Sequence, residues 1–448
     1  MRLSNSREIA MEILVDINKN GAYSNKSIDR HLNKSISSQD ENLIRELVYG
    51  VLENKIYIDY ILSKASKIKV KKIHFQIIEI LRTAIYQIVF MDRIPHSAAV
   101  NEAVNLAKKF GHKGTIGFVN GVLRSIVREK DNFAKIDIKD KAKYISTKYS
   151  HQEYMVKRWI KEFGEEFTED LCKSNNDRPL LNIRVNTLKT TKEELLNKLQ
   201  ERDYDVLEAK YANDGLIITN PFRITETEEF KKGHFTIQDE SSILVGQITN
   251  PKKGSLILDM CAAPGGKSTH LAQLMNNKGK ILSRDIYDHK IDLIKENIKR
   301  LGISNIEVQI YDALELDENL INKVDYCIVD APCSGLGLIR RKPEIKINRK
   351  EEDINNLIEL QKQIINTAKQ YVKVGGILIY STCTVEQDEN INLIGEFLEE
   401  NPNFKLVSIE NELDNKENLD TLNEGYIQLF PNIHGTDGFF ISKMIREL

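Results

Sequence analysis

The sequence predicts a multidomain protein in which an all-α bundle and a small α+β domain precede a doubly wound, mostly parallel α/β domain. At roughly 150 residues per domain, 448 residues correspond to about three domains. The first third shows helical apolar spacing without alternating strand patterns, whereas the chain from Ser255 onward alternates apolar β runs with helices. We expect domains at 1–135, 140–230 and 231–448.

Apolar residues recur at helical spacing throughout the first third. Ser38 to Glu41 has the sequence of a capping box and is expected to open a helix there. The first stripe stops before Gly21, and no hairpin signal interrupts the region. The predicted helical segments are 9–17, 43–52, 73–90, 98–110 and 118–126.

The net charge of −2 conceals an uneven distribution. Residues 1–135 carry 22 Lys and Arg against 14 Asp and Glu, a balance of +8, so that the remainder carries −10. A basic first third is typical of nucleic-acid binding, although a solvated surface with a chance excess fits equally well. Two clusters of basic residues stand out as candidate phosphate contacts: Lys64, Lys67, Lys69, Lys71 and Lys72, and Arg124, Arg128 and Lys130.

Composition excludes several classes of protein. With 41% hydrophobic and 29% charged residues, the chain is neither disordered nor collagen-like. It has no uninterrupted apolar stretch of membrane-spanning length, and Met1–Asn5 is not followed by a signal-peptide core. Five irregularly spaced cysteines do not form a disulfide framework. We therefore expect a cytoplasmic protein without a membrane partner.

The middle segment changes character. Short strands are expected at 182–185, 204–207 and 215–218. Thr190 and Thr191 offer two overlapping capping boxes for a helix that runs through Leu199. This pattern predicts a small α+β domain and gives no function by itself.

The last domain should contain the functional site. Its strands are expected at 256–260, 281–285, 306–312, 326–330 and 377–383, with helices between them. Such a pattern is typical of a parallel sheet covered on both faces, in which ligands bind beyond the carboxyl ends of the strands. Unusual residues at these strand ends are therefore candidates for ligand binding or catalysis.

A loop of small residues follows the first of these strands. It consists of Cys261, Ala262, Ala263, Pro264, Gly265, Gly266 and Lys267, and a helix begins directly after it. Two glycines let the backbone approach a ligand closely. The end of the loop imitates a P-loop, but a P-loop needs glycine at position 261. A different nucleotide-like ligand is therefore implied.

Acidic residues stand at the next three strand ends: Asp285, Asp312 and Asp330. A carboxylate at the second strand end suits a ribose diol, and several carboxylates favour a cationic ligand over a triphosphate. S-adenosylmethionine, with its sulfonium and ammonium groups, meets both conditions. The alternative is that each Asp merely caps the following helix.

Two cysteines follow neighbouring strands of the expected sheet. Cys333 lies in Asp330–Gly335 (DAPCSG), and Cys383 ends Tyr380–Cys383 (YSTC). If the two strands are adjacent, both thiols face one cleft. A thiolate that adds to carbon 6 of a pyrimidine makes carbon 5 nucleophilic enough to accept a methyl group. Asp330 would contact the N3 edge of a cytosine. No cysteine or histidine spacing suggests a metal.

These residues resemble the RNA cytosine-5 methyltransferases, and the whole chain is most similar to the bacterial 16S ribosomal RNA (cytosine-5) methyltransferase B family. The matching stretches are Asp259–Lys267, Asp330–Gly335 and Tyr380–Cys383, and further support comes from 117–124, 238–242 and 434–440. The resemblance implies a NusB-like N-terminal domain and a Rossmann-like methyltransferase domain.

The resemblance also implies roles for individual residues. Cys383 would be the nucleophile, and Cys333 would assist product release. The loop from Cys261 to Lys267 would bind S-adenosylmethionine together with Asp285, Asp312 and Asp330, and Asp330 would also lie beside the target base. The implied partner is 16S ribosomal RNA, with a monomeric enzyme and no metal. Transfer RNA as the substrate, and an RNA-binding assembly factor without activity, remain the alternatives.

Overall fold

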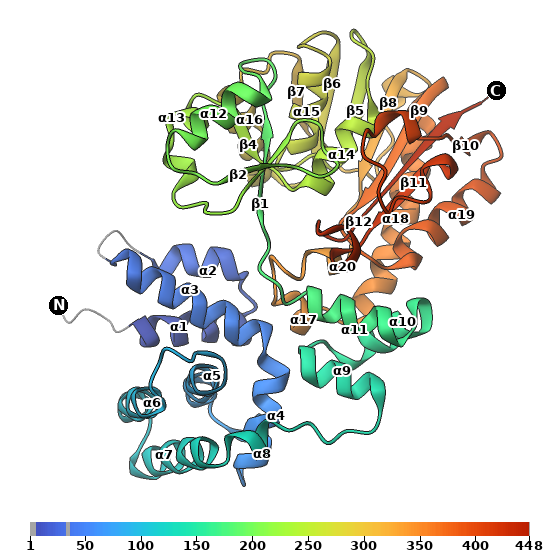
Figure 1. The fold of residues 1–448 in the computed structure, drawn as a ribbon. Helices are drawn as coiled ribbons and strands as arrows, with labels where there is room; N and C mark the ends of the chain where they lie inside the picture. Colours follow the sequence, from blue (N-terminus) through green and yellow to red (C-terminus); the bar gives the residue numbers. More distant parts are fainter. Residues whose placement is uncertain (1–5, 33–35, 448) are drawn as a thin grey trace. The chain divides into compact units, whose positions relative to one another are not determined.

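The computed structural model describes residues 6–32 and 36–447, which divide into two compact units. The first consists of Met1–Asp177 with Ile339–Arg349, and the second of Arg178–Leu338 with Lys350–Leu448 (Figure 1). The opening stretch Met1–Asn5, to which the signal-peptide expectation refers, lies outside the described residues.

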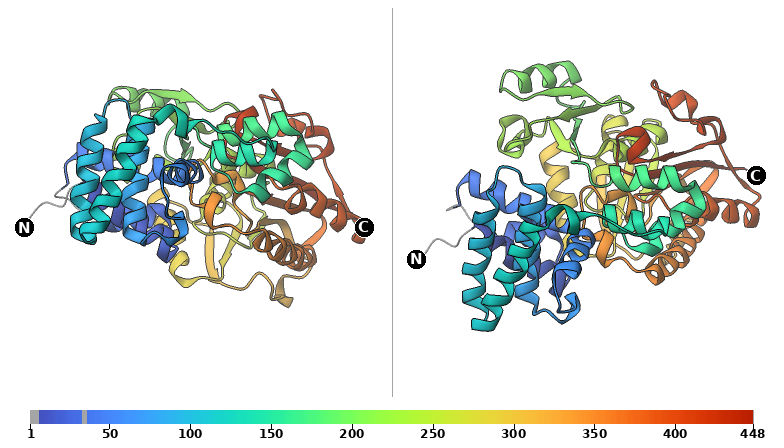
Figure 2. Two further views of the ribbon diagram at one scale, coloured as in Figure 1. Left: turned by 90° about the horizontal axis from the view of Figure 1, so that it is seen from below. Right: turned by 60° about the horizontal axis from the view of Figure 1, so that its bottom comes forward.

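The first unit is helical, as predicted, and the described part of residues 1–135 contains no strand. The apolar helix α5 (Phe75–Phe90) is buried along most of its length and packs against α1, α3, α4, α6 and α7. Helices α6 (His96–Phe110) and α7 (Lys113–Arg128) pack against each other and run side by side in both views of Figure 2. The helices are α1 (Ser6–Asn20), α2 (Ser24–His31), α3 (Ser38–Glu53), α4 (Lys55–Ala65), α5, α6 (His96–Phe110), α7 (Lys113–Arg128), α8 (Lys130–Ala134), α9 (Lys141–Tyr149), α10 (Glu153–Phe163), α11 (Glu165–Ser174) and α17 (Ile345–Asn348).

The capping box expected at Ser38 is wrong by one residue. Ser37 has an extended backbone, and its side chain accepts a hydrogen bond from the backbone N–H of Asp40, so that helix α3 already begins at Ser38. Two adjacent serines are equivalent in the sequence pattern. Backbone geometry decides which of them is the N-cap.

A short segment of the chain, Ile339–Arg349, belongs to the helical unit although its neighbours in sequence belong to the other unit. The Lys346 side chain is buried, and its Nζ donates to the Glu53 carbonyl at 2.7 Å and to Asn176 Oδ1 at 2.6 Å. Glu344 accepts from the backbone N–H and the hydroxyl of Ser24. These contacts fix the segment within the unit.

Burial lowers the pKa of Lys346 to about 7, whereas an unfolded chain restores an ordinary lysine value. The unfolded state therefore binds more protons above pH 7, and the stability of this unit should rise by about 1–2 kcal/mol between pH 7 and pH 9. The rise can be measured by urea unfolding followed through the fluorescence of Trp159, the single, fully buried tryptophan in α10. The difference should disappear in Lys346→Met and persist in the exposed-site control Lys161→Met. An unchanged rise in Lys346→Met would contradict this assignment.

The second unit begins with a small antiparallel sheet in the order β2-β3-β1-β4. Its strands are β1 (Leu181–Val185), β2 (Val206–Glu208), β3 (Gly215–Ile218) and β4 (Phe235–Ile237). Helix α12 (Lys192–Gln200) begins with a capping box between Thr191 and Glu194, the second of the two expected alternatives. Helices α12 and α13 (Glu228–Lys231) pack in this region, which confirms the predicted α+β character.

The main sheet has the strand order β10-β12-β9-β8-β5-β6-β7, and β11 pairs with β12. The central pairs β9-β8, β8-β5, β5-β6 and β6-β7 are parallel, and the pairs that involve β12 are antiparallel. The strands are β5 (Leu256–Asp259), β6 (Lys280–Asp285), β7 (Ile306–Ile310), β8 (Val324–Asp330), β9 (Val372–Thr382), β10 (Phe404–Leu406), β11 (Tyr426–Leu429) and β12 (Phe439–Arg446).

Consecutive residues of these strands enter different cores. Ile257 and Ile328 join the core that includes residues of α14 (Glu240–Thr249) and α15 (Gly266–Leu274). Leu258 and Val329 join the core with α18 (Glu351–Tyr371) and α19 (Ile391–Glu400). Helices therefore cover both faces, and the predicted doubly wound, mostly parallel sheet is confirmed. None of the described helices is long and apolar enough to span a membrane.

Candidate active site

Parallel pairing brings the predicted strand-end residues to one edge of the main sheet. Asp285 and Asp330 are the last residues of β6 and β8, and Asp312 lies two residues beyond β7. Asp330 is paired in register with Ser381 of β9, so the loops after β8 and β9 start side by side. The expectation that the strands before Cys333 and Cys383 are neighbours is thus confirmed.

The stretch Cys261–Lys267 follows β5 at this edge and runs into the first turn of α15, which begins at Gly266. Gly265 has φ 92°, a left-handed conformation that favours glycine, and it directly precedes the first turn of α15. The Ala262 N–H donates to the Arg284 carbonyl at 2.8 Å, which ties the loop to β6. The loop therefore presents a helix N-terminus beside the end of the neighbouring strand.

Asp285 and Asp312 have different environments. Asp285 is 6% exposed, and its carboxylate accepts from the backbone N–H groups of Ala263 and Tyr287, both at 3.2 Å. Asp312 accepts from the Leu314 N–H at 2.9 Å, as expected for a residue that caps a turn. Asp285 thus belongs to the loop itself, whereas Asp312 stabilises the chain that follows β7.

Asp330 is held between two side chains. One carboxylate oxygen lies 2.6 Å from Lys267 Nζ, and the other accepts a hydrogen bond from the Ser381 hydroxyl at 2.8 Å. Burial alone would lower the pKa of Lys267, but the charge and hydrogen bond of Asp330 outweigh it and raise the pKa. Lys267 is therefore a cation at neutral pH, and it fixes the orientation of Asp330.

Cys333 and Cys383 lie together, with 3.2 Å between their sulfur atoms. The hydrogen bond with Cys383 and burial raise the pKa of Cys333 well above that of an ordinary thiol. Cys333 therefore holds its proton and can donate it to the Cys383 sulfur. Burial also raises the pKa of the three other cysteines, and a protonated thiol is a weak nucleophile: these are Cys172, Cys261 and Cys327.

The C-terminal hairpin of β11 and β12 closes one side of the cysteine loops. The Gly337 N–H donates to the Cys383 carbonyl at 3.0 Å, and the Gly438 N–H donates to the Gly337 carbonyl at 3.0 Å. A Cβ atom at Gly337 would lie 1.8 Å from the Gly438 carbonyl oxygen. Two glycines are thus required where these backbones cross.

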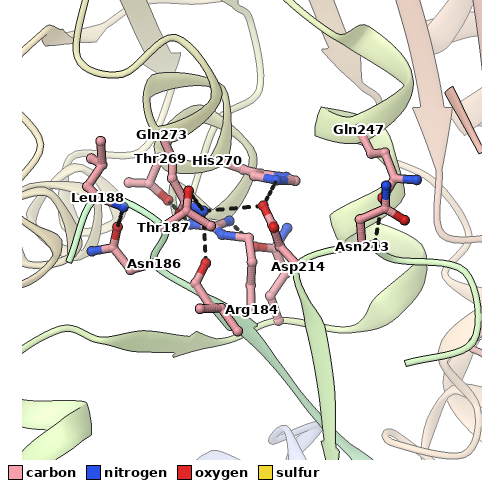
Figure 3. Close-up of polar contacts among 12 residues, drawn as sticks. Arg184, Asn186, Thr187, Leu188, Asn213, Asp214, Gln247, Thr269, His270 and Gln273 are labelled. Atoms are coloured by element: carbon pink, nitrogen blue, oxygen red, sulfur yellow. Dashed lines mark hydrogen bonds and ion pairs between the residues drawn. The ribbon is translucent and has the colours of Figure 1, made fainter. Parts of the chain in front are cut away.

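One residue that sequence reasoning missed is Arg184, in β1 of the small sheet. Its buried guanidinium donates to the Gly266 carbonyl at 2.6 Å, to Thr269 Oγ1 at 3.1 Å and to the Gln238 side-chain carbonyl (Figure 3). It therefore holds the first turn of α15, where the stretch Cys261–Lys267 ends. A charged residue inside a strand pattern was the only signal in the sequence, and a surface position explains such a residue equally well.

Asp214 and two side chains of α15, His270 and Gln273, extend this contact. Gln273 donates to the Val185 carbonyl at 2.8 Å, and His270 Nε2 lies 3.7 Å from an Asp214 carboxylate oxygen (Figure 3). Burial lowers the pKa of His270 to about 4, so the imidazole is neutral at physiological pH. The small sheet is thus joined to α15 by hydrogen bonds at several points.

Replacing Arg184 by Met should release the first turn of α15, since three hydrogen bonds from one charged group are lost at a buried site. We expect a local destabilisation of about 2 kcal/mol. Amide hydrogen exchange of residues 262–270 would then be about thirtyfold faster. Arg202→Met, which removes a partly exposed ion pair with Glu229, should leave exchange in this segment unchanged. Unaltered protection in Arg184→Met would mean that the guanidinium does not hold the turn.

Among the described residues, no group of His, Cys, Asp and Glu side chains is arranged to hold a metal ion.

Comparisons with known proteins agree with this geometry. Residues 246–445 match the family model of the 16S rRNA methyltransferase RsmB/F, residues 4–128 match the NusB family, and residues 151–225 match the RsmF/B-like ferredoxin-like domain. Among solved structures, PH0851 is 26% identical and covers the whole chain with a TM-score of 0.83. A methyltransferase homolog from Pyrococcus horikoshii is 29% identical over 69% of this chain and all of its own, with a TM-score of 0.60.

Two curated relatives extend over nearly the full length. A probable ribosomal RNA small subunit methyltransferase B from Bacillus subtilis is 41% identical over 100% of both chains. A probable protein of the same name from Synechocystis is 32% identical over 98% of this chain and 99% of its own. The predicted NusB-like bundle and Rossmann-like domain are confirmed, and the chain belongs to the ribosomal RNA small subunit methyltransferase B family.

Proposed function

We propose that this protein methylates carbon 5 of a cytosine in 16S ribosomal RNA, with S-adenosylmethionine as methyl donor and a covalent bond between Cys383 and carbon 6 of the base. The main support is the pair of thiols 3.2 Å apart beside the Lys267–Asp330 ion pair. The names of the curated relatives indicate the substrate, and the motifs around both cysteines indicate the position that is methylated.

The residues at the sheet edge fit S-adenosylmethionine. Asp285 offers a carboxylate at the end of β6, where it can accept hydrogen bonds from a ribose diol. The loop from Cys261 to Lys267 supplies small residues and backbone N–H groups, and Asp312 and Asp330 add negative charge suited to a cation. When bound, the cofactor supplies a methyl group activated by its sulfonium.

Cys383 would begin the reaction as a thiolate whose sulfur forms a bond to carbon 6, while the electrons of the 5,6 double bond move to make carbon 5 nucleophilic. Asp330, held by Lys267 and Ser381, would contact the N3 edge and stabilise the adduct. After methylation, loss of the carbon-5 proton to a base restores the double bond and expels the Cys383 sulfur. Cys333, beside that sulfur, would assist the release.

Replacing Cys383 by Ala should abolish methylation, lowering the rate by at least about four orders of magnitude because the covalent route is lost. Affinity for S-adenosylmethionine, measured by titration calorimetry, should stay within about twofold, since Cys383 lies outside the loop. The assay uses methyl transfer to deproteinised small-subunit RNA, with Cys172→Ala as a control in the helical unit. Full activity in Cys383→Ala would overturn the nucleophile assignment.

Replacing Cys333 by Ala should instead let a covalent protein–RNA adduct accumulate, because formation of the bond continues while its release slows. The adduct would migrate slowly on a denaturing gel and would disappear in the double variant with Cys383→Ala. If the band formed in Cys383→Ala and not in Cys333→Ala, the two roles would have to be exchanged.

The bundle would supply RNA affinity through phosphate contacts. The five lysines from Lys64 to Lys72 are exposed, and Lys64 also donates to the Lys135 carbonyl at 2.6 Å. Methyl transfer to ribosomal rather than transfer RNA would separate the proposal from its nearest alternative. No transfer to either RNA would favour an RNA-binding assembly factor. The monomeric state, the cytoplasmic location, the absence of a metal and the division at 1–135, 140–230 and 231–448 remain predictions.

A further inference from the structure

Two adjacent buried residues, Glu389 and Asn390, form hydrogen bonds with the loops that carry the two cysteines, one residue to each loop. Glu389 ends the short turn η5 (Gln387–Glu389), and Asn390 directly precedes α19. Both side chains are fully buried, and neither belongs to the motifs that indicate the reaction. Burying a carboxyl group costs free energy unless hydrogen bonds within the protein replace those it made with water.

Glu389 holds the loop of Cys333 on both sides of the cysteine. One of its carboxylate oxygens accepts from the Ser334 N–H at 2.8 Å and from Gln361 Nε2 at 2.8 Å. The same Gln361 nitrogen donates to the Pro332 carbonyl at 2.9 Å. The two residues that flank Cys333 are therefore fixed through one carboxylate.

Asn390 does the same for the loop of Cys383. Its Oδ1 accepts from the Thr382 hydroxyl at 2.5 Å, and its Nδ2 donates to the Thr384 carbonyl at 3.1 Å and to Gln428 at 2.7 Å. The two loops are also joined directly by a hydrogen bond between the hydroxyl groups of Ser334 and Thr384, which lie 2.7 Å apart. Each cysteine thus has both neighbours held by a fixed polar side chain.

We propose that Glu389 and Asn390 are positioning residues that set the contact between the Cys333 and Cys383 sulfur atoms. Because the two residues are consecutive, their Cα atoms are about 3.8 Å apart, so the points at which the two loops are held lie close together. The spacing of the thiols then depends on this short buried segment in addition to the pairing of β8 with β9. A displacement of about 1 Å at a reacting atom can cost two orders of magnitude in rate.

Glu389 also affects the protonation of Cys333. It is among the groups that raise the pKa of Cys333, after the hydrogen bond with Cys383 and burial. Burial raises the pKa of Glu389 itself, while hydrogen bonds from Ser334, Gln361 and Thr384 oppose that shift. Cys333 thus remains the protonated partner of the pair.

Oxidation by diamide measures the spacing directly, because each equivalent takes two electrons and two protons from neighbouring thiols, forming one disulfide and one hydrazine. The full-length protein, without RNA or cofactor, is treated at pH 8, and the Cys333–Cys383 cross-link is quantified by peptide mass spectrometry. We expect Glu389→Ala and Asn390→Ala to form it about tenfold more slowly than the unaltered protein. Glu389→Gln, which keeps an acceptor of the same size for the Ser334 N–H, should retain most of the rate.

Two controls separate positioning from loss of fold. Glu396→Gln, which alters an exposed ion pair between Glu396 of α19 and Lys362 of α18, should cross-link at the original rate. Cys327, buried in β8, should remain resistant to alkylation in every variant. If both alanine variants cross-linked at the original rate with Cys327 protected, the positioning role would be overturned. An equal loss in Glu389→Gln and Glu389→Ala would also count against it.

The catalytic meaning of this inference rests on the proposed function, whereas the cross-linking test does not. For the reaction we expect Glu389→Ala to lower kcat about tenfold and to leave KM for RNA within about twofold, since no RNA contact is removed. If the alanine variants cross-linked more slowly as expected but the unaltered protein did not methylate RNA, only the proposed function would be refuted. If the unaltered protein methylated RNA but the alanine variants cross-linked at the original rate, only the positioning role would be refuted.

Discussion

The parallel pairing of β8 with β9 brings Asp330, Ser381 and the loops of the two cysteines to one place at the edge of the main sheet. Asp330 and Ser381 are partners in this register, and Cys333 and Cys383 follow them by three and two residues. A slip by one residue would turn Asp330 toward the opposite face of the sheet and separate it from Ser381. Because both strands are central and buried, their apolar residues on two faces specify the register.

The ion pair between Lys267 and Asp330 connects this edge to the loop after β5. Lys267 brings a charge into a buried site, which is stable only because Asp330 lies 2.6 Å away. The same contact leaves Asp330 an oriented acceptor beside the thiols. Arg184 affects Lys267 indirectly, because its guanidinium donates a hydrogen bond to the carbonyl of Gly266, the residue before Lys267. The small sheet therefore contributes to the site without supplying a reacting group.

The sequence was sufficient to predict the strand ends, since DAPCSG and YSTC directly follow apolar strand patterns and parallel strands share one ligand-binding edge. It was insufficient for contacts that depend on distant segments. Arg184 is 82 positions from Gly266, and Gln361 lies on a helix whose partner Glu389 comes 28 positions later. Nothing in the local pattern distinguishes these residues from exposed ones. The placement of Ile339–Arg349 in the helical unit was missed for the same reason, because its packing partners come from residues far away in the chain.

The difference between the two cysteines arises from their surroundings, because both follow parallel strands at the same edge. The hydrogen bond with Cys383, burial and the nearby Glu389 all raise the pKa of Cys333, so this thiol retains its proton. Cys383 is among the groups that raise the pKa of Lys267. The two sulfur atoms are therefore in contact but have different ionisable neighbours, Glu389 for Cys333 and Lys267 for Cys383.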